Sequence, residues 1–185
     1  MRIVGGSLGG RSLKGPSSDA IRPTSDRMRE SLFNILAHGM GVELEHARVL
    51  DLFAGTGANA LEAISRGAGY AVLVDIGAEA RGLQRANVES LGLGGVTRIL
   101  RRDATKLGPV SPFEPFDLVF CDPPYGKGLG EAALTSAIVG GWLNAGAIVV
   151  LEERSNIDCT LPPPLEELDR RKAGETQLIF GRFAG

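Results

Sequence analysis

The sequence predicts an α/β fold in which one mostly parallel, doubly wound sheet closes with antiparallel strands. Short apolar runs alternate with helical stretches along most of the chain, a pattern typical of parallel strands joined by crossover helices. Four of these strands lead into an aspartate, and the carboxyl ends of parallel strands form the ligand-binding edge of such a sheet. The last two strands, 165–172 and 176–183, are joined through Ala173-Gly174, a connection short enough for an antiparallel pair.

Residues 1–40 are expected to form a small extension before the sheet. Residues 2–6 and 10–13 have the pattern of two short strands around a glycine-rich turn, that is, a hairpin. A helix then follows, with Thr24 or Ser25 as its cap. Its apolar face, which we expect to join the core, consists of Met28, Leu32, Ile35 and Leu36.

Composition indicates a single domain over residues 1–185, with the Rossmann-like core in 47–185. The 185 residues are 43% hydrophobic and 23% charged, without repeats or low-complexity tracts. No apolar stretch is long enough to span a bilayer and the first thirty residues lack a signal-peptide core, so we expect a cytoplasmic protein. Cys121 and Cys159 lack the spacing of zinc ligands, so no metal is expected. No long exposed apolar stripe demands a dimer, and we expect a monomer.

The first core strand, 48–53, runs directly into a glycine turn and a helical stretch, 58–66. Gly55 and Gly57 allow a tight turn and the close approach of a ligand, while the start of the helix presents unpaired N–H groups. A nucleotide-like cofactor should therefore bind at this turn. The turn residues expected to contact it are Phe53, Ala54, Gly55, Thr56 and Gly57.

Two cofactors fit this turn. The spacing Gly55-x-Gly57-x-x-Ala60 satisfies the loose dinucleotide fingerprint, so a nicotinamide cofactor is one possibility. Asp51, just before the turn, favours S-adenosylmethionine, because its carboxylate can receive an ammonium group and would repel a pyrophosphate. Asp75 follows the next strand, 70–74, where an acidic residue can bind ribose hydroxyls, a contact that both cofactors need.

The third strand, 96–100, is followed by Asp103 and Ala104. We expect Asp103 to accept a hydrogen bond from an adenine amino group and Ala104 to line the ring. A helix cap is the alternative for Asp103, since aspartate is a preferred capping residue. Its place in a row of strand-end aspartates favours the adenine contact.

The fourth strand, 116–121, ends in Asp122-Pro123-Pro124-Tyr125, the candidate catalytic tetrapeptide. Asp122 is also expected to contact the cofactor. The prolines fix φ and donate no N–H, which leaves the Asp122 side chain and the Pro123 carbonyl as acceptors. An NH2 group on a heterocycle could donate to both. Tyr125 would then offer a stacking face, worth about 1–3 kcal/mol for a nucleobase. A strand followed by a proline turn without chemistry is the alternative.

The alternation continues with a helix over about residues 131–142 and a strand over 147–151, followed by a stiff connector, 162–164. A hairpin that ends a doubly wound sheet resembles the class I methyltransferase fold. Nicotinamide-binding folds end in parallel strands, so this resemblance favours S-adenosylmethionine.

Several motifs occur together along nearly the whole chain. The N-terminal motifs are Arg2-Ile3-Val4-Gly5-Gly6, Gly10-Arg11-Ser12-Leu13, Arg22-Pro23-Thr24-Ser25-Asp26-Arg27 and Glu30-Ser31-Leu32-Phe33-Asn34-Ile35-Leu36. The core motifs are Asp51-Leu52-Phe53-Ala54-Gly55-Thr56-Gly57, residues 61–68 and the 122–125 tetrapeptide. In combination they resemble the bacterial small-subunit ribosomal RNA guanine-N2 methyltransferases of the RsmD type. Leu8-Gly9 departs from the aromatic or basic pair often found there in that family, which puts one RNA contact in doubt.

The resemblance implies a class I S-adenosylmethionine-dependent methyltransferase, with a mostly parallel seven-stranded sheet and an antiparallel C-terminal strand. It also implies that the methyl group passes to the exocyclic N2 of one guanine in small-subunit ribosomal RNA, leaving S-adenosylhomocysteine. The family favours an assembled or partly assembled ribonucleoprotein particle as substrate. Asp122 and the Pro123 carbonyl would hold the amine in line with the sulfonium.

Basic residues gather at the start of a chain whose net charge is only −2. The first thirty residues hold six basic and three acidic residues, which suggests a surface that contacts phosphates. Solvated arginines are the alternative, and for Arg27 and Arg29 so is pairing with Asp26 and Glu30 along the helix. The candidates for contacts to RNA or to the cofactor carboxylate are Arg2, Arg11, Arg22, Arg27 and Arg29.

Three rival functions use similar residues. An adenine-N6 DNA or RNA methyltransferase would use the same tetrapeptide, but the N-terminal motifs argue against it. A glutamine methyltransferase normally begins this turn with Asn rather than Asp122. A non-catalytic RNA-binding assembly factor on the same fold would have disabled cofactor residues, whereas the four strand-end aspartates are intact here.

Overall fold

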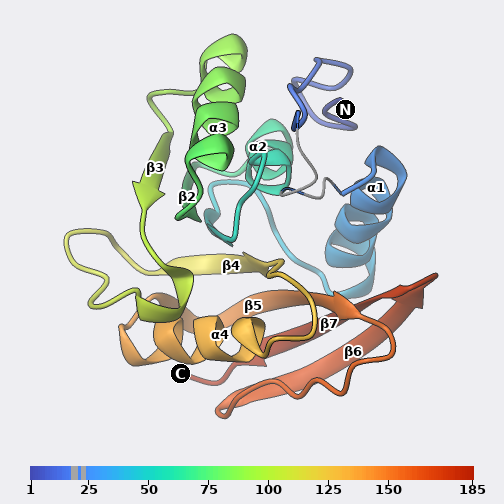
Figure 1. Ribbon diagram of the computed structural model, residues 1–185, viewed down its shortest axis with the longest axis vertical. Helices are drawn as coiled ribbons and strands as arrows, with labels where there is room; N and C mark the ends of the chain where they lie inside the picture. The colour runs from blue at the N-terminus through green and yellow to red at the C-terminus, as the bar shows by residue number, and fades with distance from the viewer. Residues whose placement is uncertain (18–20, 22–23) are drawn as a thin grey trace.

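A seven-stranded sheet in the order β3-β2-β1-β4-β5-β7-β6 organises the computed structural model, which describes residues 1–17, 21 and 24–185 (Figure 1). The strands are β1 (Arg48–Leu52), β2 (Tyr70–Asp75), β3 (Thr97–Arg101), β4 (Phe116–Cys121), β5 (Leu143–Arg154), β6 (Leu165–Ala173) and β7 (Thr176–Phe183). The helices are α1 (Asp26–Asn34), α2 (Ala58–Ser65), α3 (Ala78–Leu91) and α4 (Leu129–Val139), with a π-helical turn η1 (Ile35–Gly39) and a 3-10 turn η2 (Ala104–Lys106).

The sheet has the predicted mixed character. β1 pairs in parallel with β2 and β4, β2 with β3, and β4 with β5, whereas β7 is antiparallel to both β5 and β6. This confirms the class I methyltransferase fold expected from the sequence. Leu52 lies opposite Cys121 in the β1–β4 register, so both strands end at the same level. The glycine turn and Asp122, which follow these two ends, are therefore neighbours.

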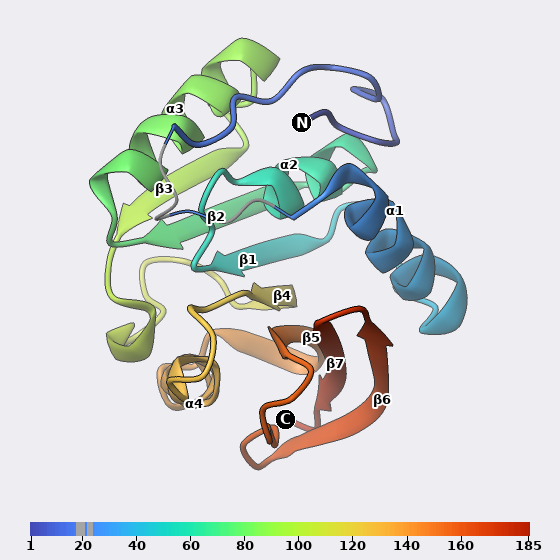
Figure 2. The same ribbon diagram turned by 45° about the vertical axis from the view of Figure 1, so that its right-hand side comes forward.

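Helices cover both faces of the sheet (Figure 2). On one face, α1 and α2 pack over a cluster that includes Phe33, Leu73 and Phe120. On the other, α4 and the segment around η2 pack over Val72 and Trp142. Alternate residues of one strand thus enter opposite clusters, which is why the central strands read as uninterrupted apolar runs. None of the helices in the described part of the chain is long and apolar enough to cross a membrane.

Two elements differ from the sequence prediction around Trp142. The helix ends at Val139, because Gly140 and Gly141 follow it and Gly141 has φ +79°, a backbone conformation that ends a helix. Trp142 is instead fully buried on the face of the sheet that α4 covers, where its indole N–H donates to the Gly108 carbonyl at 2.8 Å. β5 extends to Arg154 rather than Leu151, since its polar end pairs with β7.

The N-terminal segment forms a minimal hairpin with one antiparallel bridge, between Arg2 and Ser12. The Ile3 amide donates to the Arg11 carbonyl at 2.9 Å, while the Ile3 side chain is buried against α2 and α3. Ser25, one of the two predicted caps, accepts from the Met28 amide and starts α1. The extension is therefore packed on the core.

The carboxylate of Glu62, fully buried on α2, joins the extension to the sheet domain. Its Oε1 accepts from the Val4 amide at 2.9 Å and from Arg29 Nε at 3.1 Å. Its Oε2 accepts from the Gly5 amide and from Arg66 Nε, both at 2.9 Å. Burial alone would raise the pKa of Glu62, but these four donors outweigh it and hold the pKa below its usual value.

The first prediction concerns this carboxylate. Glu62→Gln should lower the free energy of unfolding by about 3–5 kcal/mol at neutral pH, because Arg29 and Arg66 lose a buried partner. Because the folded-state pKa is depressed, the Glu62 contribution is complete above the ordinary glutamate pKa of about 4.3 and is lost as the pH falls below it. Urea unfolding from pH 7 to pH 3 should therefore show a shallower acid dependence in the variant. Exposed Glu43 provides the control, and an equal loss in Glu43→Gln would contradict this account.

Candidate active site

The predicted site residues lie at the carboxyl ends of the parallel strands. The arrowheads of β1, β2 and β3 point to the same side in Figure 2, and β4 runs parallel to β1. Four connections emerge at this edge: the glycine turn after β1, the Asp75 segment after β2, the Asp103 segment after β3 and the 122–125 tetrapeptide after β4.

The glycine turn has an unusual backbone. Phe53 has φ +56°, which is rare for a residue with a side chain and costs on the order of 1–3 kcal/mol. Gly57 has φ +83°, and a Cβ there would lie 2.7 Å from Leu73 Cδ2. Such strain persists only where surrounding contacts hold it. Here they are hydrogen bonds from Gln84 Nε2 to the Gly55 carbonyl and from Asn87 Nδ2 to the Thr56 carbonyl, both at 3.0 Å.

Asp75 fixes the turn from the neighbouring strand. Its Oδ2 accepts from the Gly55 amide and its Oδ1 from the Gly77 amide, both at 2.9 Å. The residue is only half-buried, and each carboxylate oxygen can accept a second hydrogen bond. Asp75 can therefore hold the turn and still receive a hydroxyl of a ligand.

Asp51 is placed differently from the prediction. It is only 2% exposed, and its Oδ2 accepts from the Ala60 amide in the first turn of α2 at 3.2 Å. Burial raises the pKa of this carboxyl well above its usual value, partly offset by the Ala60 N–H, and nearby Asp75 raises it further. The predicted direct contact with an ammonium group does not fit this burial. Asp51 instead supports the start of α2 from behind.

Asp103 caps the short turn η2, which was the alternative considered from the sequence. Its Oδ1 accepts from the Thr105 amide at 2.9 Å and from the Thr105 hydroxyl at 2.7 Å, and these bonds lower its pKa. Its Oδ2 has no hydrogen-bond partner within the described ranges, so one oxygen can still serve a ligand. The Ala104 side chain, 3% exposed, packs into the core beneath the site instead of lining a ring.

The tetrapeptide is held by β5. Asp122 and Tyr125 are half-buried, Pro123 is buried and Pro124 is exposed. The Tyr125 hydroxyl donates to Glu152 Oε2 at 2.9 Å. Burial and the negative charge of Glu152 raise the pKa of Tyr125, so the phenol stays neutral. The ring is therefore fixed in position by its hydroxyl while much of it remains accessible.

Two more residues at the end of β5 support this turn and were missed by the sequence reasoning. The Gly126 amide donates to buried Glu153 at 3.2 Å, and the Arg154 guanidinium lies 5.7 Å from the centre of the Tyr125 ring. The available signal was the charged run that directly follows the apolar residues 147–151. Because the predicted strand ended at Leu151, the prediction did not connect Glu153 and Arg154 with the tetrapeptide.

Known proteins resemble this chain in sequence and in fold. The model of a family described as Conserved hypothetical protein 95 matches residues 1–182. The ribosomal RNA small subunit methyltransferase D of Escherichia coli (strain K12) is 36% identical over 162 residues, which cover 88% of this chain and 78% of that protein. The putative rRNA methyltransferase YlbH of Bacillus subtilis (strain 168) is 34% identical over 91% of this chain and 89% of that protein.

The chain belongs to the ribosomal RNA small subunit methyltransferase D family. A solved structure described as the putative methyltransferase yhhF from Escherichia coli agrees with this, with a TM-score of 0.84, 32% identity and coverage of 100% of this chain and 98% of that chain. The family resemblance expected from the sequence motifs is thus confirmed.

The arginines proposed for RNA contacts in this member of the methyltransferase D family differ in accessibility. Arg2, Arg11 and Arg27 are exposed, and Arg11 Nη2 donates to the Ser90 carbonyl on α3 at 2.8 Å. Arg22 lies outside the described residues. Arg29 is a correction, because its side chain is fully buried and has no surface to offer RNA.

The contacts of Arg29 explain its burial. Its Nη2 donates to Asp26 Oδ1 at 2.8 Å and to the Arg2 carbonyl, in addition to the Nε bond to Glu62. The pairing with Asp26 is the one that the sequence offered as an alternative. Arg29 is therefore a structural residue of the extension.

Two other findings delimit the site. Among the residues that the structure describes, no group of three or more His, Cys, Asp and Glu side chains is arranged to hold a metal ion.

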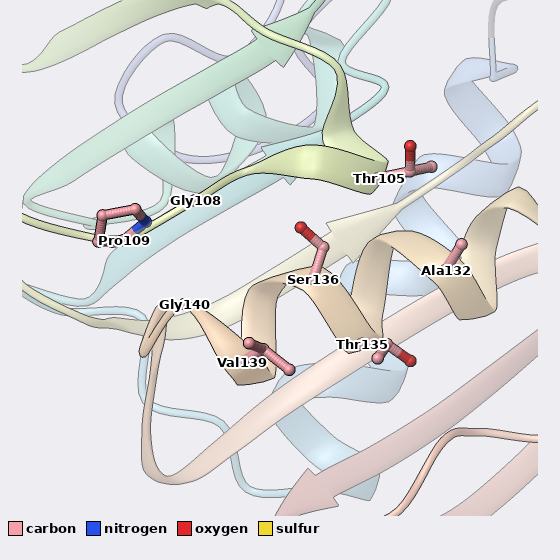
Figure 3. Close-up of a pocket in the computed structure, with 8 residues that line it drawn as sticks. All are labelled: Thr105, Gly108, Pro109, Ala132, Thr135, Ser136, Val139 and Gly140. Atoms are coloured by element: carbon pink, nitrogen blue, oxygen red, sulfur yellow. The ribbon is translucent and has the colours of Figure 1, made fainter.

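A hollow of about 510 Å³ lies between α4 and the segment that begins at η2, with Thr105, Ser136 and Val139 in its lining (Figure 3). None of its eight lining residues belongs to the predicted site.

The second prediction tests the glycine turn. Gly57→Ala should weaken binding of S-adenosylmethionine, the expected cofactor, at least tenfold in calorimetric titration, because the new methyl group meets Leu73 and displaces the turn. Gly92→Ala is a matched control, since Gly92 is also left-handed at φ +70° but its Cβ would meet nothing within 4 Å. The control should lose stability without losing affinity. Equal S-adenosylmethionine affinity in both variants and the wild type would show that the turn is not part of the binding site.

Proposed function

We propose that this chain transfers the methyl group of S-adenosylmethionine to the exocyclic N2 of a guanine in small-subunit ribosomal RNA. The observation that supports this best is the adjacency of the glycine turn after β1 and Asp122-Pro123-Pro124-Tyr125 after β4, at the ends of paired strands. This adjacency supports a cofactor site beside a site for a planar amine. The relatives named as ribosomal RNA small subunit methyltransferases support ribosomal RNA as the substrate.

The residues of the turn fit S-adenosylmethionine. A Cβ at Gly57 would meet buried Leu73 at 2.7 Å, so a side chain there would displace the turn. A buried amide oxygen near it, Gln84 Oε1, has no hydrogen-bond partner in the described part of the chain. Asp75 would accept from the ribose hydroxyls and Asp103 Oδ2 from the adenine amino group. When bound, the cofactor supplies an electrophilic methyl carbon on a sulfonium.

Asp122 and Pro123 would act on the acceptor. An arylamine nitrogen is a weak nucleophile, because its lone pair is delocalised into the ring. The Asp122 carboxylate and the Pro123 carbonyl would accept hydrogen bonds from the two N–H groups of the amine. These bonds would favour a more tetrahedral nitrogen and stabilise the positive charge that develops on it. Proximity supplies most of the remaining acceleration, since well-oriented pairs reach effective molarities on the order of 10⁵–10⁸ M.

Tyr125 would position the base. Its ring offers a stacking face, and the bond from its hydroxyl to Glu152 fixes the ring before the substrate arrives. A guanine within a helix hides its N2 in the minor groove, so the target must be extruded, at least cost when it is already unpaired. An unpaired guanine in an assembled or partly assembled small subunit is the substrate we propose.

The direct test measures transfer of labelled methyl from S-adenosylmethionine to unmodified small ribosomal subunits, free small-subunit RNA, DNA and protein, followed by digestion to nucleosides. Label in N2-methylguanosine is the expected result. Label in N6-methyladenine or in a peptide would replace the proposal with another methyltransferase class. Cofactor binding without transfer to any of these acceptors would contradict the enzymatic proposal.

The third prediction separates the acceptor side from the cofactor side. Asp122→Ala should lower kcat by about 10²–10³ while leaving S-adenosylmethionine affinity within about threefold, because it removes an acceptor that acts on the developing charge. Asp158→Ala, which removes an exposed carboxylate, is the control and should change neither quantity. A parallel loss of affinity in Asp122→Ala would make Asp122 a cofactor ligand instead.

The fourth prediction is the converse. Asp75→Ala should weaken S-adenosylmethionine binding by at least tenfold, because it removes both the ribose acceptor and the hydrogen bond that holds Gly55 of the turn. At saturating cofactor, single-turnover transfer should recover most of the wild-type rate. Unchanged affinity would exclude Asp75 from the cofactor site.

A further inference from the structure

A groove between α3 and the outer strand β3 is lined by four arginines. Arg81 and Arg85 come from one face of α3, and Arg98 and Arg101 come from β3. The hollow measures about 430 Å³, and its lining includes no acidic residue. The two glutamates of α3, at positions 79 and 89, are outside it. A chain with a net charge of −2 thus gathers four positive charges in one groove.

These arginines are not neutralised by the protein. Arg85, Arg98 and Arg101 are exposed, and no ion pair or hydrogen bond engages their guanidinium groups within residues 1–17, 21 and 24–185. Arg81 Nη1 donates to the Ile76 carbonyl at 2.7 Å. Unpaired like charges repel one another, and an anionic ligand with several charges relieves that repulsion.

Other arginines of the same protein show the contrast. Arg48 donates to the Glu114 and Pro115 carbonyls and lies over two aromatic rings, and Arg66 and Arg170 form ion pairs. These side chains are committed to the fold. Arg85, Arg98 and Arg101 differ from them, because no such contact engages their guanidinium groups in the described part of the chain.

The groove begins at the cofactor edge of the sheet. Arg81 binds the loop that follows Asp75, and Arg101 ends the strand that leads to Asp103. β3 is three strand spacings from β4, roughly 14 Å. A polynucleotide whose target base lies at Asp122 can reach this distance within a few nucleotides.

The N-terminal segment contacts the far end of α3. Arg11, already proposed to contact RNA, donates to the Ser90 carbonyl near the far end of α3. The N-terminal segment lies beside α3 in both views (Figures 1 and 2). Half-buried Arg81 in the first turn of α3, exposed Arg85 in its middle and exposed Arg11 beside its last turn therefore follow the helix along its length.

We propose that Arg85, Arg98 and Arg101 bind backbone phosphates of the RNA that flanks the target base. Guanidinium groups bind phosphate oxygens bidentately, and several in one groove would orient the strand without reading its sequence. This deepens the proposed function and rests on it, because it assumes that the substrate is RNA. It adds a contact surface on β3 and α3, which the N-terminal arginines do not include.

The test compares two triple variants with the same change in charge. One is Arg85→Gln/Arg98→Gln/Arg101→Gln in the groove. The control is Arg171→Gln/Lys172→Gln/Arg182→Gln, on exposed positions of β6 and β7 toward the opposite edge of the sheet. Binding to unmodified small-subunit RNA and to unmodified small ribosomal subunits is measured by filter retention at several salt concentrations. S-adenosylmethionine affinity and thermal unfolding are measured for both variants.

The groove variant should bind RNA at least tenfold more weakly at 0.1 M salt. The slope of log K against log salt should fall by about two, since each lost phosphate contact removes roughly 0.7 with single-stranded RNA. The control should stay within about twofold of the wild type, and neither variant should lose S-adenosylmethionine affinity. Should the triple variant unfold early, the three single substitutions provide the same measurement, each lowering the slope by about 0.7.

Three outcomes would overturn the groove as an RNA site. These are an unchanged slope in the groove variant, an equal loss in the control, and a loss seen only with assembled subunits, which would indicate a ribosomal protein as partner. A loss of RNA binding confined to the groove variant supports the groove as an RNA site, even if the wild type makes no N2-methylguanosine. The absence of N2-methylguanosine would overturn the proposed function and leave the groove proposal standing.

Discussion

The buried carboxylate of Glu62 is the constraint on which the N-terminal half depends. A lone carboxylate in the core would cost several kcal/mol, but this one is surrounded by two backbone amides and two guanidinium groups. These donors come from the N-terminal hairpin, α1 and α2. Because α2 directly follows Gly57, the same carboxylate fixes the hairpin and α1 relative to the cofactor turn. The extension and the sheet domain thus behave as one body near the site.

The aspartates at the strand ends share a second task, which is to hold backbone. Asp51 accepts from Ala60, Asp75 from Gly55 and Gly77, and Asp103 from Thr105. In each case a carboxylate satisfies N–H groups of a tight turn that would otherwise be unpaired. The site is therefore ordered before any ligand arrives, which lowers the entropy that binding must remove. On the neighbouring strand, Glu153 does the same for the Gly126 amide, and Glu152 accepts from the Tyr125 hydroxyl.

The sequence predicted the sheet well, since central strands buried on both faces must be apolar and therefore stand out. It predicted the polar end of β5 poorly, because Glu152 to Arg154 are in the strand only through their pairing with β7. Arg29 was misjudged because its partner Glu62 is 33 residues away, and an arginine reads the same whether buried or exposed. The groove arginines were missed because they are divided between a helix and a strand whose packing the pattern does not reveal.

The strand order affects how the chain can fold during synthesis. β7 lies between β5 and β6, so β6 has no neighbour in the sheet until residues 176–183 have been made. The cofactor turn needs only the first half of the chain, whereas the full length of β5, with Glu152 as the support for Tyr125, needs β7. A nascent chain would therefore complete the glycine turn early and the support of Tyr125 last.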